Sequence, residues 1–190
     1  MDTAPFAASP RMHRYPSALI DRLLLADGRS VVMRPVLPQD AQAEQLFVRG
    51  LSATSRVLRF HIGIRELAPD MLRALTDIDQ RRHVAIVAQR DDEDDEDDEP
   101  AIVADARYVM TDDSSEAEFA IAVADEWQGV GLGRALMTRL LAHARRHGVT
   151  RLVGDVLHDN TRMIEMVRRA GGSFGRIPGN PIVTRARFEL

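Results

Sequence analysis

The chain has 190 residues and a mass of 21.2 kDa, which suits one domain of ordinary size. Apolar residues make up 45% of it and charged residues 28%, so a disordered or fibrous protein is excluded. Cysteine is absent, which excludes disulfides, thiolate metal sites and a cysteine nucleophile. No apolar run approaches the ~20 residues that span a bilayer, and no secretory signal opens the chain. We therefore expect a cytoplasmic protein that does not bind membranes.

The charged residues are distributed unevenly. All 25 basic residues are arginines, and nine consecutive acidic residues occupy 91–99. The rest of the chain carries 25 basic residues against 20 acidic ones, so it is mildly basic. We predict a solvated loop for the acidic run, with electrostatic capture of a lysine-rich protein substrate as the alternative. Nucleic acid is not an expected partner, because the arginines are scattered and the acidic run repels phosphate.

The first half of the chain predicts an arm, a strand and three helices. Residues 1–20 hold several Pro and Ser breakers and are predicted to form a flexible N-terminal arm, with one domain over 21–190. A strand is predicted over 30–36, after the turn at Asp27-Gly28. Helices are predicted to begin near Asp40, at Ser52 and at Pro69.

The second half predicts mostly strands. Two β-type runs at 83–88 and 101–110 flank the acidic run and predict a hairpin, and a third strand is predicted over 116–123. A long helix from about residue 132 ends at Gly148, followed by a strand over 151–156 and a helix capped by Asp159 or Asn160. Closing strands are predicted at 173–177 and 181–188. This order predicts a mixed, mostly antiparallel α/β sheet flanked by helices.

A glycine-rich loop, residues 128–134, precedes the long helix. Its glycines allow backbone N–H groups to approach a ligand closely, and a helix start offers unpaired donors and a positive dipole end. Such a loop suits a pyrophosphate, although an ordinary helix entry is the alternative. The spacing is not that of a P-loop, which requires a lysine, nor that of the dinucleotide-binding fingerprint.

Gln128-x-x-Gly131-x-Gly133 after a strand, with Asn160 opening a second helix, resembles the GNAT superfamily of N-acetyltransferases. The resemblance covers roughly Arg22 to Leu190 and implies a sheet that is splayed open at an acetyl-CoA site, with no metal. The loop then holds the pyrophosphate, and the strand before it runs along the pantetheine. The cofactor-binding residues implied are Ile121, Ala122, Val123, Gln128, Gly129, Val130, Gly131, Leu132, Gly133, Arg134 and Asn160.

A narrower resemblance points to the acceptor. The segment 51–60, Leu-Ser-x-x-Ser-Arg-x-Leu-Arg-Phe, together with Glu118-Phe119-Ala120 and Asp125-x-Trp127, is similar to the catalytic domain of bacterial protein lysine acetyltransferases. Known substrates of that family include acyl-CoA synthetases. The resemblance implies Glu118 as the general base and a protein with an exposed lysine as partner. Many members carry a fused regulatory domain, and we expect none within these 190 residues.

Each of these residues also has a simpler interpretation. Glu118 is alternatively a solvated strand carboxylate, with Glu116 as the fallback base on the same face. Asn160 is alternatively only a helix cap. Trp127 is expected to pack in the core, and Arg56 and Arg59 are expected on a solvated helix face. The histidines show no metal-ligand spacing.

The implied chemistry is direct attack of an amine on the thioester, because a cysteine-linked route is impossible here. Many GNAT enzymes protonate the leaving thiolate with a tyrosine of the second helix. The corresponding segment, Thr161 to Met166, has none, so the general acid is unassigned. Two other functions stay open, a small-molecule amine N-acetyltransferase and a catalytically silent acyl-CoA-binding regulator. The sequence does not predict the oligomeric state.

Overall fold

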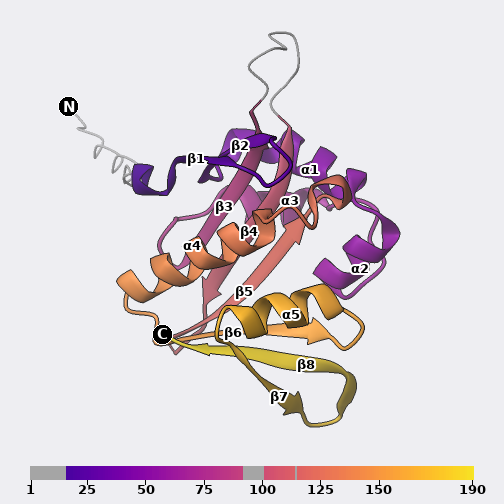
Figure 1. Cartoon of the computed structure of the whole chain (residues 1–190), viewed down its shortest axis with the longest axis vertical. Helices are drawn as coiled ribbons and strands as arrows, with labels where there is room; N and C mark the ends of the chain where they lie inside the picture. The colour runs from indigo at the N-terminus through magenta and orange to yellow at the C-terminus, as the bar shows by residue number, and fades with distance from the viewer. Residues whose placement is uncertain (1–15, 92–100, 114) are drawn as a thin grey trace, which may run out of the picture.

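The protein is a single mixed sheet with helices on both faces (Figure 1). The computed structural model describes residues 16–91, 101–113 and 115–190. Most of the expected arm and nearly all of the acidic run, residues 92–99, therefore lie outside the described residues. Within them, no helix is long and apolar enough to cross a membrane.

Over the residues that the structure describes, the sheet has eight strands in the order β1-β2-β3-β4-β5-β6-β8-β7. All neighbouring pairs are antiparallel except β5 and β6. The strands are β1 Asp21–Leu24, β2 Ser30–Pro35, β3 His83–Arg90, β4 Ile102–Met110, β5 Glu116–Val123, β6 Arg151–Leu157, β7 Ser173–Ile177 and β8 Asn180–Glu189. The predicted mixed, mostly antiparallel α/β fold is confirmed.

Within the described part of the chain, five α-helices flank the sheet: α1 Ala41–Gly50, α2 Ala53–Phe60, α3 Pro69–Thr76, α4 Leu132–Arg146 and α5 Thr161–Arg169. Helices α4 and α5 lie across one face in Figure 1, where the larger apolar core forms. Residues of α1, α2 and α3 pack with a smaller apolar cluster on the opposite face. The sheet thus separates two interiors.

Local sequence accounts for the helix bounds. In α4 the apolar positions repeat every four residues, and Leu132, Leu136 and Leu140 are fully buried. Gly148 follows the helix with φ +82°, a left-handed conformation that glycine adopts without strain. At the start of α2, the Ser52 hydroxyl accepts a hydrogen bond from the Ser55 N–H at 3.1 Å. Both helices begin close to the predicted residues, and α4 also ends close to the predicted one.

Two elements were not predicted. The edge strand β1 has no run of alternating apolar residues, and it is positioned by pairing with β2. Ahead of it, Ser17–Leu19 form a 3₁₀ turn, and Leu19 is buried in the larger core. The chain also crosses over at the end, so that β8 lies between β6 and β7. Tertiary packing, not local pattern, decides these features.

The sheet opens between β5 and β6. The register joins Glu116, Ala117 and Glu118 to residues 151–153 and then stops, whereas β5 stays paired with β4 as far as Val123. The Phe119 ring lies against Gly154 at this point, and a Cβ atom at Gly154 would come within 2.7 Å of it. Glycine on β6 therefore leaves space for an aromatic ring where the two strands separate.

Candidate active site

A cavity of about 290 Å³ lies where β5 and β6 separate. The end of α2, the middle of β5, the end of β6 and the start of α5 form its walls. Glu118, Ile121 and Asn160, all predicted site residues, contribute to them. The other lining residues are Leu58, Arg59, Phe60, His61, Phe119, Ala120, Asp155, Val156 and Met163. Most of these residues could not be identified from the sequence, because the cavity depends on how far the strands diverge.

Glu118 is an exposed residue of β5 that reaches the cavity. It lies opposite Val109 of β4, on the sheet face that α1, α2 and α3 cover. Glu116 lies two residues earlier but does not line the cavity, and its carboxylate pairs with Arg151 at 3.3 Å. Of the two carboxylates on this strand, only Glu118 is placed to meet a substrate in the cavity.

The glycine-rich loop leads directly into α4. Gly129 and Gly131 have φ values of +82° and +97°, so other residues would be strained there. A Cβ atom at Gly133 would meet Met166 Sδ at 3.4 Å and Val123 Cγ2 at 3.7 Å, so the loop packs closely on β5 and α5. The helix start has no side-chain cap and no acidic residue in its first turn. Its N–H donors and dipole therefore fit a pyrophosphate group.

Side chains of the predicted cofactor residues differ in what they can contact. The side chains of Leu132 and Ala122 are buried, so these residues could contact a ligand only through their backbone groups. Past Glu118, β5 has no register partner on the β6 side. Backbone groups of 121–123 are therefore placed to bond an extended ligand. Arg134, on the first turn of α4, is exposed.

Gln128 joins the loop to its surroundings. Its amide nitrogen donates to the Val123 carbonyl at 3.0 Å and to Ser55 Oγ at 3.3 Å, and its amide oxygen accepts from Arg162. The neighbouring Asp125 carboxylate accepts from the Ser52 N–H at 2.9 Å and from both serine hydroxyls at 2.8 Å. This network holds the loop against the start of α2, so Gln128 has a structural role as well.

Asn160 caps α5, with its side-chain oxygen accepting from the Met163 N–H at 3.1 Å. The helix-cap interpretation is confirmed. Because the residue also lines the cavity, its predicted cofactor contact stays a prediction. Trp127 is buried in the core, as expected, with the Arg29 guanidinium 3.9 Å from its ring centroid.

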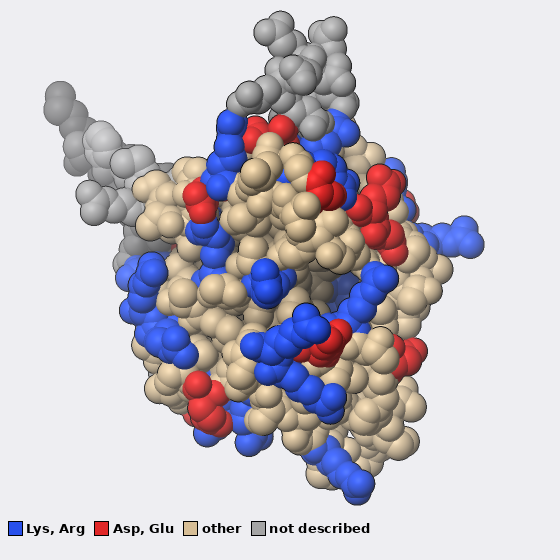
Figure 2. Space-filling view, in the orientation of Figure 1, with Lys and Arg blue, Asp and Glu red and all other residues tan. Residues whose placement is uncertain are grey.

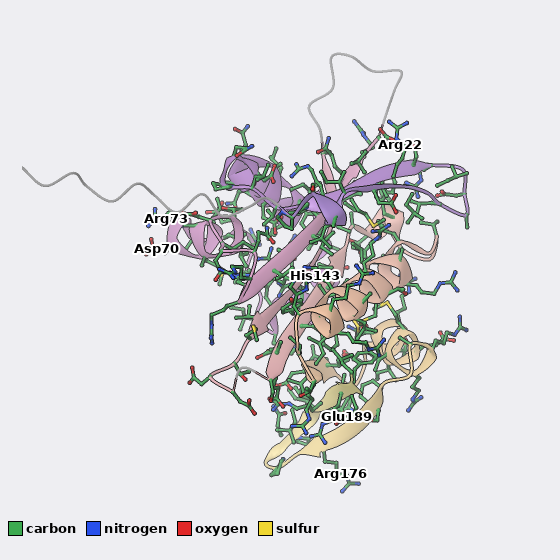
Figure 3. All side chains as sticks on the ribbon, turned by 90° about the vertical axis from the view of Figure 1, so that its left-hand side faces the viewer. Arg22, Asp70, Arg73, His143, Arg176 and Glu189 are labelled. Atoms are coloured by element: carbon green, nitrogen blue, oxygen red, sulfur yellow. The ribbon has the colours of Figure 1, made fainter. Side chains whose placement is uncertain are left out.

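The tyrosine that could protonate a leaving thiolate is missing from the described cavity lining. Tyr108 is fully buried on the opposite face of the sheet, and its hydroxyl hydrogen-bonds His143 Nδ1 at 2.9 Å. His143 lies in the last turn of α4, near the centre of the view in Figure 3. Burial raises the pKa of Tyr108 to about 12. Tyr15 lies outside the described residues, so the general acid stays unassigned.

A group of buried charges lies beside the cavity. Arg107 of β4 pairs with Asp105 through Nε at 2.8 Å and approaches Glu44 of α1 at 3.5 Å. Burial and the Asp105 charge raise the pKa of Glu44 to about 8, and the oxygen Oε2 has no hydrogen-bond partner. Burial lowers the pKa of Arg59, which lies 3.9 Å from Asp105. The predicted solvated face is wrong for Arg59, since its side chain is only 13% exposed.

Arginine side chains gather over α4 and α5 around a hollow in this face of the molecule (Figure 2). The exposed arginines of these two helices are Arg134, Arg145, Arg146, Arg162, Arg168 and Arg169. The charge of Arg134, on the first turn of α4, favours an anionic ligand at the start of that helix. Among the residues described, no three His, Asp or Glu side chains gather as a metal site.

The sheet opening, the cavity with a carboxylate and the glycine-rich helix start are the features expected of a GNAT-type fold. The sequence model of the Acetyltransferase (GNAT) family matches residues 58–171, and the chain belongs to that family. The suspected GNAT membership and the enzyme class are both confirmed.

Individual relatives agree with this membership. The chain is 37% identical over 124 residues to acetyltransferase PA5475 of Pseudomonas aeruginosa. The aligned region covers 65% of this chain and 64% of that protein. It is 31% identical over 150 residues to acetyltransferase Pat of Mycolicibacterium smegmatis. This aligned region covers 78% of the chain and 43% of the relative. The chain thus matches less than two thirds of either relative's length.

A solved structure shows the same architecture. The crystal structure of the GNAT domain of S. lividans PAT superposes with a TM-score of 0.82 and 28% identity. The match covers 93% of this chain and all of that domain.

Proposed function

We propose that the chain is an acetyl-CoA-dependent N-acetyltransferase that modifies lysine side chains of proteins, with Glu118 as general base. One observation carries the proposal. The carboxylate of Glu118 lines the cavity at the sheet opening, and the uncapped start of α4 follows β5 in the chain. The catalytic domain is proposed to be residues 21–190, with 1–20 as an arm, working in the cytoplasm.

The donor is acetyl-CoA, which the GNAT family uses, and it supplies the activated thioester. The backbone of 129–134 and the side chain of Arg134 would hold the pyrophosphate at the start of α4. Backbone groups of 121–123 would bond the pantetheine along the unpaired edge of β5. Asn160 would contact the same arm from α5, because it already lines the cavity.

Glu118 would help to overcome an energetic obstacle on the acceptor side. A lysine amine has a pKa near 10.4, so holding it neutral at pH 7 costs roughly 4.6 kcal/mol. A carboxylate in the cavity wall accepts that proton directly or through a water molecule. The ammonium is thereby converted to the nucleophile next to the bound donor. Transfer is direct, because the chain contains no cysteine to carry the acetyl group.

The protein-lysine acceptor rests on the relatives. The chain is similar to a mycobacterial Pat and to the GNAT domain of S. lividans PAT, and the resemblance to protein lysine acetyltransferases includes the segment 51–60. We propose acyl-CoA synthetases as the first substrates to test. The acidic run 91–99, predicted as a solvated loop, is retained as an alternative docking element for a lysine-rich surface.

The test is acetyl transfer from acetyl-CoA to a purified acyl-CoA synthetase, followed by intact mass. We expect Glu118→Gln to slow transfer at least about tenfold, which corresponds to about 1.4 kcal/mol of barrier. The matched control is Glu116→Gln, since this carboxylate lies on the same strand but outside the cavity.

Three other outcomes would redirect the proposal. Turnover of free amines without protein transfer would favour a small-molecule acetyltransferase. Tight acetyl-CoA binding with no turnover on either acceptor would favour a silent regulator. Equal activity of Glu118→Gln and the wild type would remove Glu118 as the base.

A further inference from the structure

Helix α2 forms one wall of the cavity, yet little apolar packing holds the helix in place. Its last residues, Leu58, Arg59 and Phe60, line the cavity. Phe60 is partly buried against the smaller apolar cluster. No residue of this eight-residue helix is fully buried, whereas α4 buries six of its residues. Most helices owe their stability to the packing of a buried face, so α2 depends on other contacts for its position.

Hydrogen bonds at the start of α2 join this helix to the segment that enters the glycine-rich loop. The Asp125 carboxylate accepts from the Ser52 N–H at 2.9 Å and from the hydroxyls of Ser52 and Ser55, each at 2.8 Å. The Ser55 hydroxyl also accepts from the Gln128 amide nitrogen at 3.3 Å. One serine of α2 therefore bridges two residues at the entrance to the loop.

The segment that carries Asp125 is held from its other side as well. Arg29, in the turn between β1 and β2, donates to the Glu126 carbonyl at 2.8 Å. The Arg29 guanidinium also lies 3.9 Å from the centroid of the Trp127 ring, which is buried in the larger core. Asp125 thus belongs to an anchored segment, and α2 is the less firmly held of the two partners.

We propose that Asp125 and Ser55 are positioning residues that hold α2 in place as the wall that the acceptor meets. Glu118 and α2 lie on the same face of the sheet, so an amine that approaches this carboxylate passes the end of α2. The last turn of α2 lies roughly one and a half turns beyond Ser55, and a rigid helix carries a shift at one end to the other. The inference rests on the proposed function, because it assumes that the acceptor enters beside Glu118.

The first test compares Ser55→Ala with Thr54→Ala, which removes the neighbouring hydroxyl on the same helix. Thr54 is exposed, and no hydrogen bond joins its side chain to another described residue. Alanine is the best helix former, so neither change weakens α2 itself. We expect Ser55→Ala to lower kcat/KM for the protein acceptor about fivefold, while the dissociation constant for acetyl-CoA, measured by calorimetry, changes less than about twofold. Thr54→Ala keeps the wild-type values.

Asp125 provides the second comparison. We expect Asp125→Ala to lower kcat/KM for the acceptor about tenfold. The matched control is Glu126→Ala, because the Glu126 side chain is exposed and its carbonyl still accepts from Arg29. In an Asp125→Ala background, Ser55→Ala should cost less than about a further twofold, since the contact it removes is already lost. Ser55→Thr retains the hydroxyl and should restore the wild-type kcat/KM.

Amide hydrogen exchange measures the position of α2 without any acceptor. In Asp125→Ala, the amides of residues 53–60 should exchange at least about fivefold faster than in the wild type, because the helix is released at its first turn. The amides of α4 should keep their wild-type rates, since that helix is held by its buried face. This measurement does not depend on which acceptor the protein uses.

The inference is overturned if exchange in α2 is unchanged in Asp125→Ala. It is also overturned if Ser55→Ala weakens acetyl-CoA binding by the same factor as it lowers kcat/KM, because the serine would then support the cofactor loop. Thermal unfolding establishes that each variant is folded, and Ser55→Ala serves in the exchange measurement should Asp125→Ala fail to fold. Failure of the proposed function gives a different result, since the wild type would then transfer no acetyl group to a protein while the exchange rates of α2 still respond.

Discussion

The two faces of the sheet bury different kinds of side chain. On the face covered by α4 and α5, fully buried leucines and Tyr108 form an apolar core. On the face covered by α1, α2 and α3, a smaller apolar cluster lies beside buried ionisable side chains, including Glu44 and Arg107. The first face stabilises the fold through burial. The second face contributes less to stability, because burying ionised groups costs free energy even when they are paired. Its ionised groups lie at the edge of the cavity.

Truncating the apolar face should have the largest effect on stability. We expect Leu140→Ala, at a fully buried position of α4, to lower the free energy of unfolding by about 2–5 kcal/mol. Turnover per folded molecule should remain unchanged, because Leu140 does not line the cavity. Urea denaturation and a transfer assay measure the two quantities. The control is Leu46→Ala on α1, where the residue is 53% exposed; a similar loss there would break the comparison.

Glu44 tests the charged face. The pKa of Glu44 is about 8 in the folded protein, against 4.5 for an unperturbed glutamate carboxyl. The protonated carboxyl therefore contributes fully to the free energy of unfolding below pH 4.5, and this contribution is lost as the pH rises toward 8. Glu44→Gln does not titrate. Its stability relative to the wild type should therefore rise by roughly 2–3 kcal/mol between pH 5 and pH 7. Denaturation at both pH values measures this.

Glu66→Gln is the control for that pH dependence, because the Glu66 side chain is 61% exposed and pairs with Arg49 at the surface. The stability of this variant relative to the wild type should change by less than about 0.5 kcal/mol between the two pH values. A flat response of Glu44→Gln would mean that the native carboxyl is ionised, and the contrast between the faces would weaken.

Gly154 tests the boundary between the faces. Adding a Cβ atom there forces it against the Phe119 ring at 2.7–3.0 Å. We expect Gly154→Ala to cost about 1–3 kcal/mol of unfolding free energy through overpacking. Acetyl-CoA binding should weaken as well, because Phe119 lines the cavity. Calorimetry measures both. Gly175→Ala on β7, where nothing lies within 4 Å of the added atom, is the control.

The smallest effect is expected at the outer surface of α3. Asp70 and Arg73 form an ion pair three residues apart, with side chains 90% and 70% exposed (Figure 3). Arg73→Ala should change the unfolding free energy by less than about 0.5 kcal/mol. A larger loss, measured by denaturation, would show that surface charges contribute to stability as the buried ones do.

The sequence predicted most elements because their patterns are local. The apolar repeat of α4, the hydroxyl cap of α2 and the alternation in 116–123 are each readable within a few residues. Strand β1 and the crossover that places β8 beside β6 depend on pairing between distant segments. Local pattern does not encode such pairings.

The candidate site divides in the same way. The glycine-rich loop, Glu118 and Asn160 belong to motifs and were identified in advance. Arg59 and Asp155 reach the cavity only because α2 packs over β5 and because β6 turns away from it. Single arginines on an amphipathic helix usually face solvent, so no sequence signal distinguished Arg59 from Arg56.

The early end of the β5–β6 register has a consequence for access. An unpaired strand edge in a protein attracts other extended chains and is a hazard for aggregation. Here the edge lies inside the sheet, between the end of α2 and the start of α5. An extended ligand that pairs with this edge therefore lies between the two helices. The fold keeps the backbone groups that could recruit a foreign strand away from the rim of the sheet, where neighbouring proteins would meet them.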